Sequence, residues 1–542
     1  MPLYVPRQEE PTLQQSGTRN EQHGLEALGL DGTGKLFWNL TEAALYERSI
    51  ARGETRLSAT GALVADSGAH RHLSEADRYI VREADTEESV DWESANALTR
   101  DAFDTFKTDF LAHASTRTLF AQDVLADDVP VRVLTEHAWH ALTLRNLLRP
   151  LEADAITSAT PRLTLLCVPS FKAEPEKYGV RSATVIAADL AAGLVLIAGT
   201  AHAGEIRAAL LTALGHMLPD SGTLPLCAAA SVDEAGETAL FVGLPGTGKT
   251  ALASADGRVL IADGGLGWRA EGIRALESGA YVRADHLSAE DDPALFAGLA
   301  RFGTVLENVP LDPESRAPLL GADSPTENPR AAFPLAAIGA AASTGRAPRA
   351  LFLLSCDTTG ILPPIARLTP AQAIYHFLSG YSARLPESAA GVEEAQAAFA
   401  AGFGAPFLAT HPARSSALLR PLVAQEGLSC WLVNTGWVGG KAGTGRRVPL
   451  ETSRRLVAAA LDGTLEAGEW RTDPHFGFMV PKAVEGVDAR LLDPARSWAS
   501  RMDYAKTARQ LVIRFSNNFA RFEGLVDDEV RGAQPSLAIA AE

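Results

Sequence analysis

The segment Gly243-Leu-Pro-Gly-Thr-Gly-Lys-Thr250 directly follows the apolar run at residues 238–242 and carries the clearest structural signal in the chain. It fits the pattern GxxxxGK[ST], whose glycines let consecutive backbone N–H groups point at phosphate oxygens. In such a loop Lys249 reaches the β- and γ-phosphates and the Thr250 hydroxyl binds Mg²⁺. A strand that leads into this loop predicts a nucleotide site in an α/β fold, whereas the alternative is an accidental glycine-rich turn.

Short apolar runs on both sides of this loop extend the prediction of a mixed α/β chain. The run at 259–262 ends in Asp263, at the place where a phosphate-loop protein carries a carboxylate on the metal side. The other expected strands are 163–168, 183–187, 194–198, 350–354 and 429–433, and a helix is expected over 204–217.

The length of 542 residues predicts more than one domain. We expect a flexible N-terminus at 1–25, an N-terminal domain at 26–229, a C-terminal nucleotide-binding domain at 230–530, and a flexible tail at 531–542. Residues 87–110 alternate acidic and apolar positions, which predicts a helix with a solvated face. The alanine-rich stretches 331–342 and 390–401 predict helix or compact loop.

Composition excludes several classes of protein. The net charge of −17 argues against a nucleic-acid binder, because such proteins recruit their partner with clustered positive charge. The four cysteines form no CxxC pair, so neither a disulfide scaffold nor a zinc knuckle is indicated. The polar N-terminus lacks the apolar core of a signal peptide, and the apolar stretch 185–201 is too short to span a membrane. A cytoplasmic protein without a membrane partner is therefore expected.

Several blocks in order along the chain, from about residue 66 to about residue 518, resemble ATP-dependent phosphoenolpyruvate carboxykinase. The resemblance implies two domains facing each other across a cleft, and a reaction that turns oxaloacetate and ATP into phosphoenolpyruvate, ADP and carbon dioxide. It also implies Mg²⁺ on the nucleotide and a second ion, typically Mn²⁺, at the substrate. Besides the phosphate loop, the blocks are residues 166–181, Leu306-Glu-Asn-Val309, Glu327-Asn-Pro-Arg330, residues 360–369, residues 375–380 and Asn434-Thr-Gly-Trp437.

On the nucleotide side the resemblance carries over almost completely. It implies a catalytic group of Lys249, Asp263 and the substrate-side arginine Arg330, with Mg²⁺ held through Thr250 and Asp263. One loop residue differs, since Pro245 stands where the family has a serine. The ATP-binding residues it implies are Gly243, Gly246, Thr247, Gly248, Lys249, Thr250, Arg283 and Arg447.

On the substrate and second-metal side the pattern breaks down. The family holds the second ion with a lysine, a histidine and an aspartate, and alignment puts Ala208, Cys227 and Gly264 at those positions. The substrate-side tyrosine becomes His202, and the arginine that binds the substrate carboxylate becomes Leu73. A methyl group or a hydrogen donates no electron pair, so Mn²⁺ is not expected to bind.

These losses give a main interpretation and two alternatives. Removing the metal that stabilises the enolate costs several kcal/mol, and each 1.4 kcal/mol is about a tenfold loss of rate. The main interpretation is a protein that binds Mg-ATP but has lost carboxykinase activity, with closure sensed by an unknown protein partner. The alternatives are a phosphotransferase with a different acceptor, as in the resembling HPr kinases, and a working carboxykinase with rearranged ligands. Compensation by Arg71, Arg207, His202 or Cys227 is left open.

Overall fold

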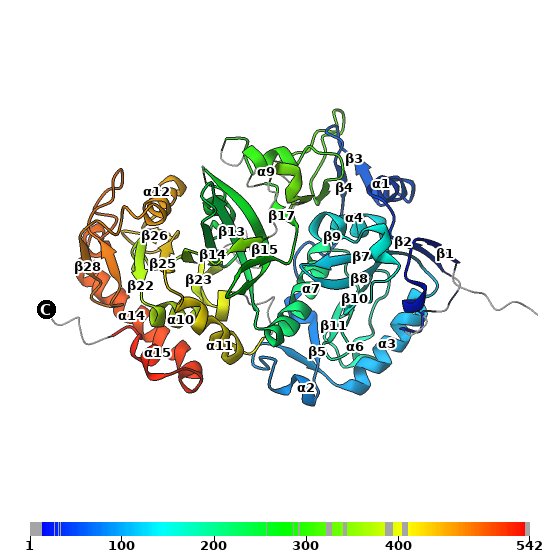
Figure 1. Cartoon of the computed structure of the whole chain (residues 1–542), viewed down its shortest axis with the longest axis horizontal. Coiled ribbons are helices and arrows are strands. Elements are labelled where there is room, and N and C mark those ends of the chain that lie inside the picture. The colour runs from blue at the N-terminus through cyan, green and yellow to red at the C-terminus, as the bar shows by residue number, and fades with distance from the viewer. Residues whose placement is uncertain are drawn as a thin grey trace, which may run out of the picture. The chain divides into compact units, whose positions relative to one another are not determined.

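The computed structural model describes residues 14–25, 28–30, 32, 34–255, 257–285, 287–290, 293–320, 328–339, 344–384, 394–403 and 410–536. The chain forms two compact units. Unit 1 is made of Met1–Ala213 and Ser278–Ile338, and unit 2 of Leu214–Glu277 and Gly339–Glu542. Both units combine sheets with covering helices, as the ribbon of Figure 1 shows, so the predicted α/β fold class is confirmed.

The large sheet of unit 1 has the strand order β1-β2-β7-β8-β10-β12-β11-β5-β6 in the described residues, with β9 paired to β7. β10 lies parallel to both β8 and β12, and these strands are buried, nearly continuous apolar runs, as expected of parallel strands covered on both faces. Its strands are β1 (Gln14–Gly17), β2 (Lys35–Trp38), β5 (Arg78–Val81), β6 (Asn96–Leu98), β7 (Thr118–Ala126), β8 (Val129–Thr135), β9 (Arg149–Pro150), β10 (Leu163–Val168), β11 (Val185–Asp189) and β12 (Leu194–Ala198).

A smaller sheet in unit 1 explains why the units differ from the expected domain boundaries. Its order is β17-β19-β18-β4-β3, so segment 278–338 pairs with strands that precede it by more than two hundred residues. The chain thus returns to unit 1 after the phosphate loop, and no single boundary between residues 229 and 230 separates the units. The strands are β3 (Thr55–Leu57), β4 (Leu63–Ala65), β17 (Gly279–Arg283), β18 (Val305–Glu307) and β19 (Arg330–Pro334).

The main sheet of unit 2 carries the phosphate loop. Its order among the described residues is β20-β16-β15-β13-β14-β21-β25-β22-β29-β28, and its centre, β14-β21-β25, is parallel. Its strands are β13 (Leu224–Asp233), β14 (Thr238–Gly243), β15 (Arg258–Arg269), β16 (Gly272–Ala275), β20 (Thr344–Arg346), β21 (Ala350–Ser355), β22 (Ile365–Leu368), β25 (Ser429–Asn434), β28 (Trp470–Thr472) and β29 (Met479–Pro481). Two short hairpins join β23 (Tyr381–Arg384) to β24 (Gln396–Phe399) and β26 (Trp437–Val438) to β27 (Arg446–Arg447).

Helix α3 buries one apolar face with Phe103, Phe106 and Phe110, whereas α4 is buried on nearly all sides. No helix in the described ranges has both the length and the apolar character that a membrane crossing requires. The helices are α1 (Glu42–Ala51), α2 (Ala84–Glu87), α3 (Arg100–Ala114), α4 (Ala138–Leu147), α5 (Ala153–Ile156), α6 (Pro175–Tyr178), α7 (Ala203–Met217), α8 (Lys249–Ala253), α9 (Pro293–Gly298), α10 (Pro370–Ser379), α11 (Pro412–Val423), α12 (Leu450–Leu461), α13 (Pro494–Ser497), α14 (Arg501–Phe519) and α15 (Asp528–Gly532).

Most expected elements are found, but three expectations fail in whole or in part. The single helix expected over 87–110 is wrong, because Thr99 caps a new helix by accepting the N–H of Ala102, and strand β6 precedes it. In the alanine-rich stretch 331–342, residues 335–338 form the expected helical turn, but residues 331–334 belong to strand β19, because pairing with two neighbours overrides alanine's helix preference. Stretch 390–401 contains strand β24. Residues 340–342 and 390–393 lie outside the described residues.

The chain termini are partly ordered. Strand β1 pairs in parallel with β2, so the expected flexible segment 1–25 is wrong for its second half. At the other end, α15 buries Val530 with 1% of its side chain exposed. Residues 1–13 and 537–542 lie outside the described residues.

Candidate active site

The phosphate loop of unit 2 connects the end of β14 to the start of α8. Gly246 and Gly248 have φ angles of 83° and 87°, a left-handed conformation that side chains with a Cβ rarely adopt. The Thr247 hydroxyl donates to the Leu244 carbonyl at 2.7 Å and so closes the turn from inside. Pro245, which lacks an N–H, leaves these glycines in place.

Lys249 lies across the mouth of this loop. Its Nζ donates to the carbonyl of Gly243 at 2.7 Å and to that of Leu244 at 3.1 Å. The ammonium group is therefore held at the end of the strand, where it can contact the phosphates of a nucleotide seated on the loop.

Thr250 and Asp263, the two Mg²⁺ ligands that the resemblance implies, lie side by side in unit 2. The Thr250 hydroxyl donates to Asp263 Oδ1 at 2.9 Å, which joins the start of α8 to strand β15. A hydroxyl and a carboxylate are hard oxygen ligands of the kind Mg²⁺ prefers, so the pair fits the Mg²⁺ of a bound nucleotide. Across all the residues that the structure describes, no three His, Cys, Asp or Glu side chains gather into a metal-binding group.

Arg447 also reaches the loop. Its Nη2 donates to the Gly246 carbonyl and its Nε to the Thr435 carbonyl, both at 3.2 Å, while the side chain stays exposed. The sequence analysis missed a second cation, Arg454 of α12, whose Nε donates to the Ala251 carbonyl of α8 at 3.2 Å. The sequence signal that could have identified Arg454 is its place on the inward-facing side of an amphipathic helix.

Arg283 and Arg330 are neighbours in unit 1. In the strand register, Arg283 of β17 lies opposite Arg330 of β19. On the other side of β19, Glu307 of β18 lies opposite Arg330. The Arg283 guanidinium contacts the carboxylate of Asp285 with two nitrogens. The assignment of Arg283 to the nucleotide, which lies with the loop in the other unit, therefore stays a prediction.

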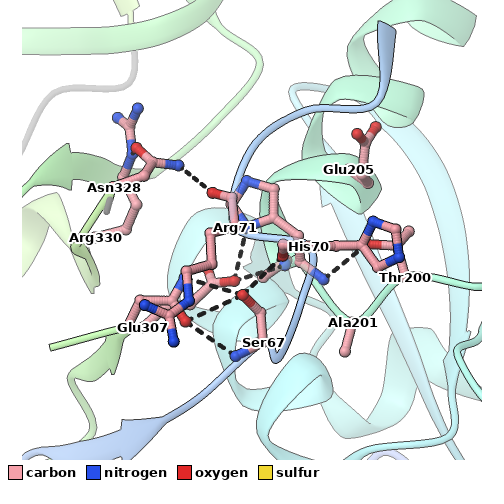
Figure 2. Close-up of polar contacts among 12 residues, drawn as sticks. Ser67, His70, Arg71, Thr200, Ala201, Glu205, Glu307, Asn328 and Arg330 are labelled. Carbon is pink, nitrogen blue, oxygen red and sulfur yellow. Dashed lines mark hydrogen bonds and ion pairs between the residues drawn. The ribbon is translucent and has the colours of Figure 1, made fainter. Parts of the chain in front are cut away.

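Arg330 is held by a chain of hydrogen bonds that Figure 2 shows. Its Nε donates to Asn328 Oδ1 at 2.8 Å, and the Asn328 amide donates to the Arg71 backbone carbonyl at 2.5 Å. Burial, together with the positive charges of Arg283 and Arg207, lowers the pKa of the Arg330 guanidinium. No carboxylate within the described ranges forms an ion pair with Arg330, so this guanidinium is available to an anion.

Glu307 joins His202 to Tyr281 in the same region of unit 1. Its Oε1 lies 2.8 Å from His202 Nδ1 and accepts the Ala203 N–H at 3.1 Å, while the Tyr281 hydroxyl donates to Oε2 at 2.5 Å. Burial alone would raise the pKa of Glu307, but the charge and hydrogen bonds of His202 and Tyr281 lower it. The carboxylate is the central acceptor of a buried polar network that the sequence analysis missed, although Glu307 lies within a quoted block.

Comparison with known proteins decides the family. The family model described as phosphoenolpyruvate carboxykinase matches residues 34–490. The chain belongs to the phosphoenolpyruvate carboxykinase family. It is 46% identical over 532 residues to a protein of Methylobacterium sp. (strain 4-46) named phosphoenolpyruvate carboxykinase (ATP), covering 97% of this chain and 99% of that protein.

Two other relatives are about as similar in sequence to this chain. A protein of the same name from Sinorhizobium fredii is 47% identical over 537 residues, with 98% of this chain and 100% of that protein covered. One from Azorhizobium caulinodans is 46% identical over 535 residues, with 97% and 100% covered. These names favour the alternative of a working carboxykinase over the main interpretation of lost activity, for which the comparisons give no support.

The positions that the resemblance assigns to the substrate and the second metal lie in segments of both units. Ala208 is fully buried on α7, and Leu73 precedes a backbone N–H, that of Ser74, which donates to Glu205. In unit 2, Cys227 lies opposite Gly265 and Gly264 lies opposite Ala228 on strands β13 and β15.

The proposed compensating cations divide into two groups. Arg71 is turned into its own loop, where its Nη2 lies 3.7 Å from Asp66 and its Nε donates to the Gly68 carbonyl at 3.3 Å. Arg207, by contrast, lies 5.8 Å from the centre of the Tyr281 ring, and Arg330 lies 5.6 Å from the same ring. Arg207 therefore lies with Arg330 beside Tyr281.

Proposed function

We propose that the protein is an ATP-dependent carboxykinase that converts oxaloacetate and ATP into phosphoenolpyruvate, ADP and carbon dioxide, with a rearranged substrate side. The observation that carries this proposal is the 46% identity over 97% of the chain to a protein named for that activity, together with an intact phosphate loop. We further propose a cytoplasmic location, as expected from the sequence.

On the nucleotide side, the chain's own residues supply binding and charge. The loop N–H groups and the Lys249 ammonium hold phosphate oxygens, and Thr250 and Asp263 are the oxygen ligands for Mg²⁺. Bound Mg-ATP would supply the phosphoryl group, with the metal neutralising charge on its oxygens. Arg447 stands at the edge of the loop as an additional cation.

On the substrate side, Leu73 cannot bind a carboxylate as the family's arginine does, and we assign that role to Arg330 and Arg207. The Arg330 guanidinium is partly buried and has no acidic partner among the described residues, so it binds a carboxylate strongly, because both charges gain from a site of low dielectric. Asn328 fixes the direction of the Arg330 fork, so the contact is prepared in advance.

A second candidate function is nucleotide binding without carboxykinase turnover, or phosphoryl transfer to a different acceptor, with an unknown protein as partner. What favours it is the resemblance, which puts Ala208, Cys227 and Gly264 at the positions of the family's metal ligands. The second ion, Mn²⁺ by resemblance, would have no cluster of ligands among the described residues, and the chemistry would have to proceed without it.

A coupled assay with oxaloacetate, ATP, Mg²⁺ and Mn²⁺ separates the two functions. The proposed function predicts turnover in the usual enzyme range of about 1–10³ s⁻¹ that disappears in Lys249→Ala. ATP binding with no oxaloacetate-dependent ADP would overturn it in favour of the second candidate. Release of ADP only when a cell extract is added would point to a different acceptor.

A further inference from the structure

A cavity of about 390 Å³ opens at one end of the main sheet of unit 2. Strands β25, β22, β29 and β28 lie side by side there (Figure 1), and the start of α10 and the end of α11 complete the wall. Ligand cavities in proteins usually span about 300–1,000 Å³. The cavity therefore has room for one small organic molecule.

The wall of this cavity is largely apolar. Leu368, Val423, Leu428, Trp470 and Met479 all line it, and Met479 is 40% exposed although it is a large apolar residue. An indole stacks on aromatic rings with an offset, and a thioether sulfur makes favourable contacts with ring edges. Two of the wall residues thus favour an aromatic ligand over an aliphatic one.

The uncharged polar groups of the wall are already engaged. The Ser429 hydroxyl donates to the Arg349 carbonyl at 3.1 Å, and the Thr369 hydroxyl accepts the Gln372 N–H at 3.2 Å as the cap of α10. Cys430 is 4% exposed, and burial raises the pKa of its thiol to about 12. The thiol therefore stays protonated at neutral pH and acts as part of the apolar wall, so a ligand is held without a covalent bond.

Arg367 supplies a positive charge to the cavity. It lies opposite Met479 in the register of β22 and β29, so the two side chains share one face of the sheet. Its Nη2 lies 3.3 Å from Glu466 Oε1, and the two side chains are 45% and 51% exposed. Such an exposed ion pair is weak because water screens it, so a ligand carboxylate can take the place of Glu466.

The cavity and the phosphate loop lie toward opposite ends of the same sheet. In the parallel register of β14, β21 and β25, Gly243 at the start of the loop is level with Val433. The cavity instead includes Ser429 and Cys430, the first residues of β25. At about 3.3 Å per residue, a molecule in the cavity and a nucleotide on the loop would not compete.

We propose that this cavity binds a small aromatic carboxylic acid, with the ring against Trp470 and Met479 and the carboxylate on Arg367, while the phosphate loop remains open to a nucleotide. The ring replaces water on the apolar wall, and the carboxylate forms a charge-assisted hydrogen bond with the guanidinium. The inference is independent of the proposed function, since none of these three residues belongs to the nucleotide side or the substrate side.

Titration of the full chain with 3-phenylpropionate, followed by the ¹³C-methyl signals of methionine, tests the inference. The chain has four methionines, and the variant Met479→Leu assigns the signal of Met479. We expect that signal to move upfield in the field of the bound ring, while those of Met217 and Met502 stay in place. A Met479 signal that does not move would overturn the inference.

Two further probes separate charge from aromaticity. 3-Phenylpropanamide has the same shape without the charge and should bind about tenfold more weakly. 3-Cyclohexylpropionate keeps the charge but not the aromatic ring and should bind about threefold more weakly. If either probe bound as tightly as 3-phenylpropionate, the assignment of an aromatic acid would be wrong.

Variants of exposed arginines complete the test. Arg367→Gln should reduce the affinity for the acid to that for the amide and leave the amide unaffected, whereas Arg367→Lys should keep the preference for the acid. Arg455→Gln is the matched control, because Arg455 forms a similarly exposed ion pair with Glu451, and it should bind like the parent. Thermal midpoints report whether the variants fold. Saturating Mg-ATP should leave the affinity unchanged, and displacement of the acid by Mg-ATP would contradict a separate site.

Discussion

The phosphate loop of unit 2 and the Glu307 network of unit 1 are built in opposite ways. The loop closes through contacts between residues near in sequence: Lys249 bonds Gly243 six positions away, and Thr250 bonds Asp263 thirteen away. The network joins His202 to Glu307 across 105 positions, and beside it the hydrogen bonds that hold Arg330 join Asn328 to Arg71 across 257. A local site survives substitutions elsewhere, whereas a site assembled from distant segments changes its chemistry when any one segment changes.

The difference also concerns exposure. Arg447 at the loop is exposed and donates to two backbone carbonyls, while Glu307 is buried and each of its oxygens has a partner. A buried charge loses much of its stabilisation when one partner is removed, since water cannot replace it. We therefore expect substitutions at the loop to change ligand binding and substitutions in the network to change stability as well.

The largest effect is expected at Lys249. Lys249→Ala should abolish stabilisation of unit 2 by Mg-ATP, which at a hundred times the dissociation constant amounts to about 2.7 kcal/mol for the parent. Thermal unfolding with and without nucleotide measures it. The exposed Lys482→Ala at the end of β29 is the matched control and should respond like the parent. Equal stabilisation of Lys249→Ala and parent would mean that the nucleotide does not use this loop.

The next effect is expected in the network. Glu307→Gln should lower the free energy of unfolding by about 2 kcal/mol at pH 7, because an amide cannot accept from the imidazole, the hydroxyl and the backbone as the carboxylate does. Chemical denaturation measures the loss. Glu314→Gln, an exposed position of the same unit, should change it little.

The same variant gives a pH dependence with a definite sign. Folding lowers the pKa of Glu307, so its contribution to stability is complete above the unfolded value of about 4.3. That contribution is lost as pH falls through the lower, folded-state pKa. The gap in stability between parent and Glu307→Gln should therefore narrow as the pH falls below about 4. A gap that stays unchanged below about pH 4 would contradict a lowered pKa of Glu307 in the native state.

How far the sequence predicts the structure follows from the same contrast. Lys249, Thr250 and Asp263 could be placed from the sequence because a glycine pattern and a following strand determine their neighbours. Glu307 and Tyr281 could not, because nothing in either segment indicates which distant side chain it meets. Strand β19 was expected as helix or compact loop for the same reason, since its alanines are held by pairing with β17 and β18.

The smallest effect is expected at Arg447, and it tests whether the loop extends beyond its own eight residues. The guanidinium donates to the Gly246 carbonyl from an exposed position, where hydrogen bonds and charges are screened by water. Arg447→Ala should therefore weaken Mg-ATP binding by only about three- to tenfold, and added salt should reduce the difference. The neighbouring Arg446→Ala is the control, because Arg446 is equally exposed on the same short strand. Titration of Mg-ATP at low and high salt compares the two variants. If Arg447→Ala lost binding as completely as Lys249→Ala, the arginine would be a principal phosphate ligand, and the view of a self-contained loop would fail.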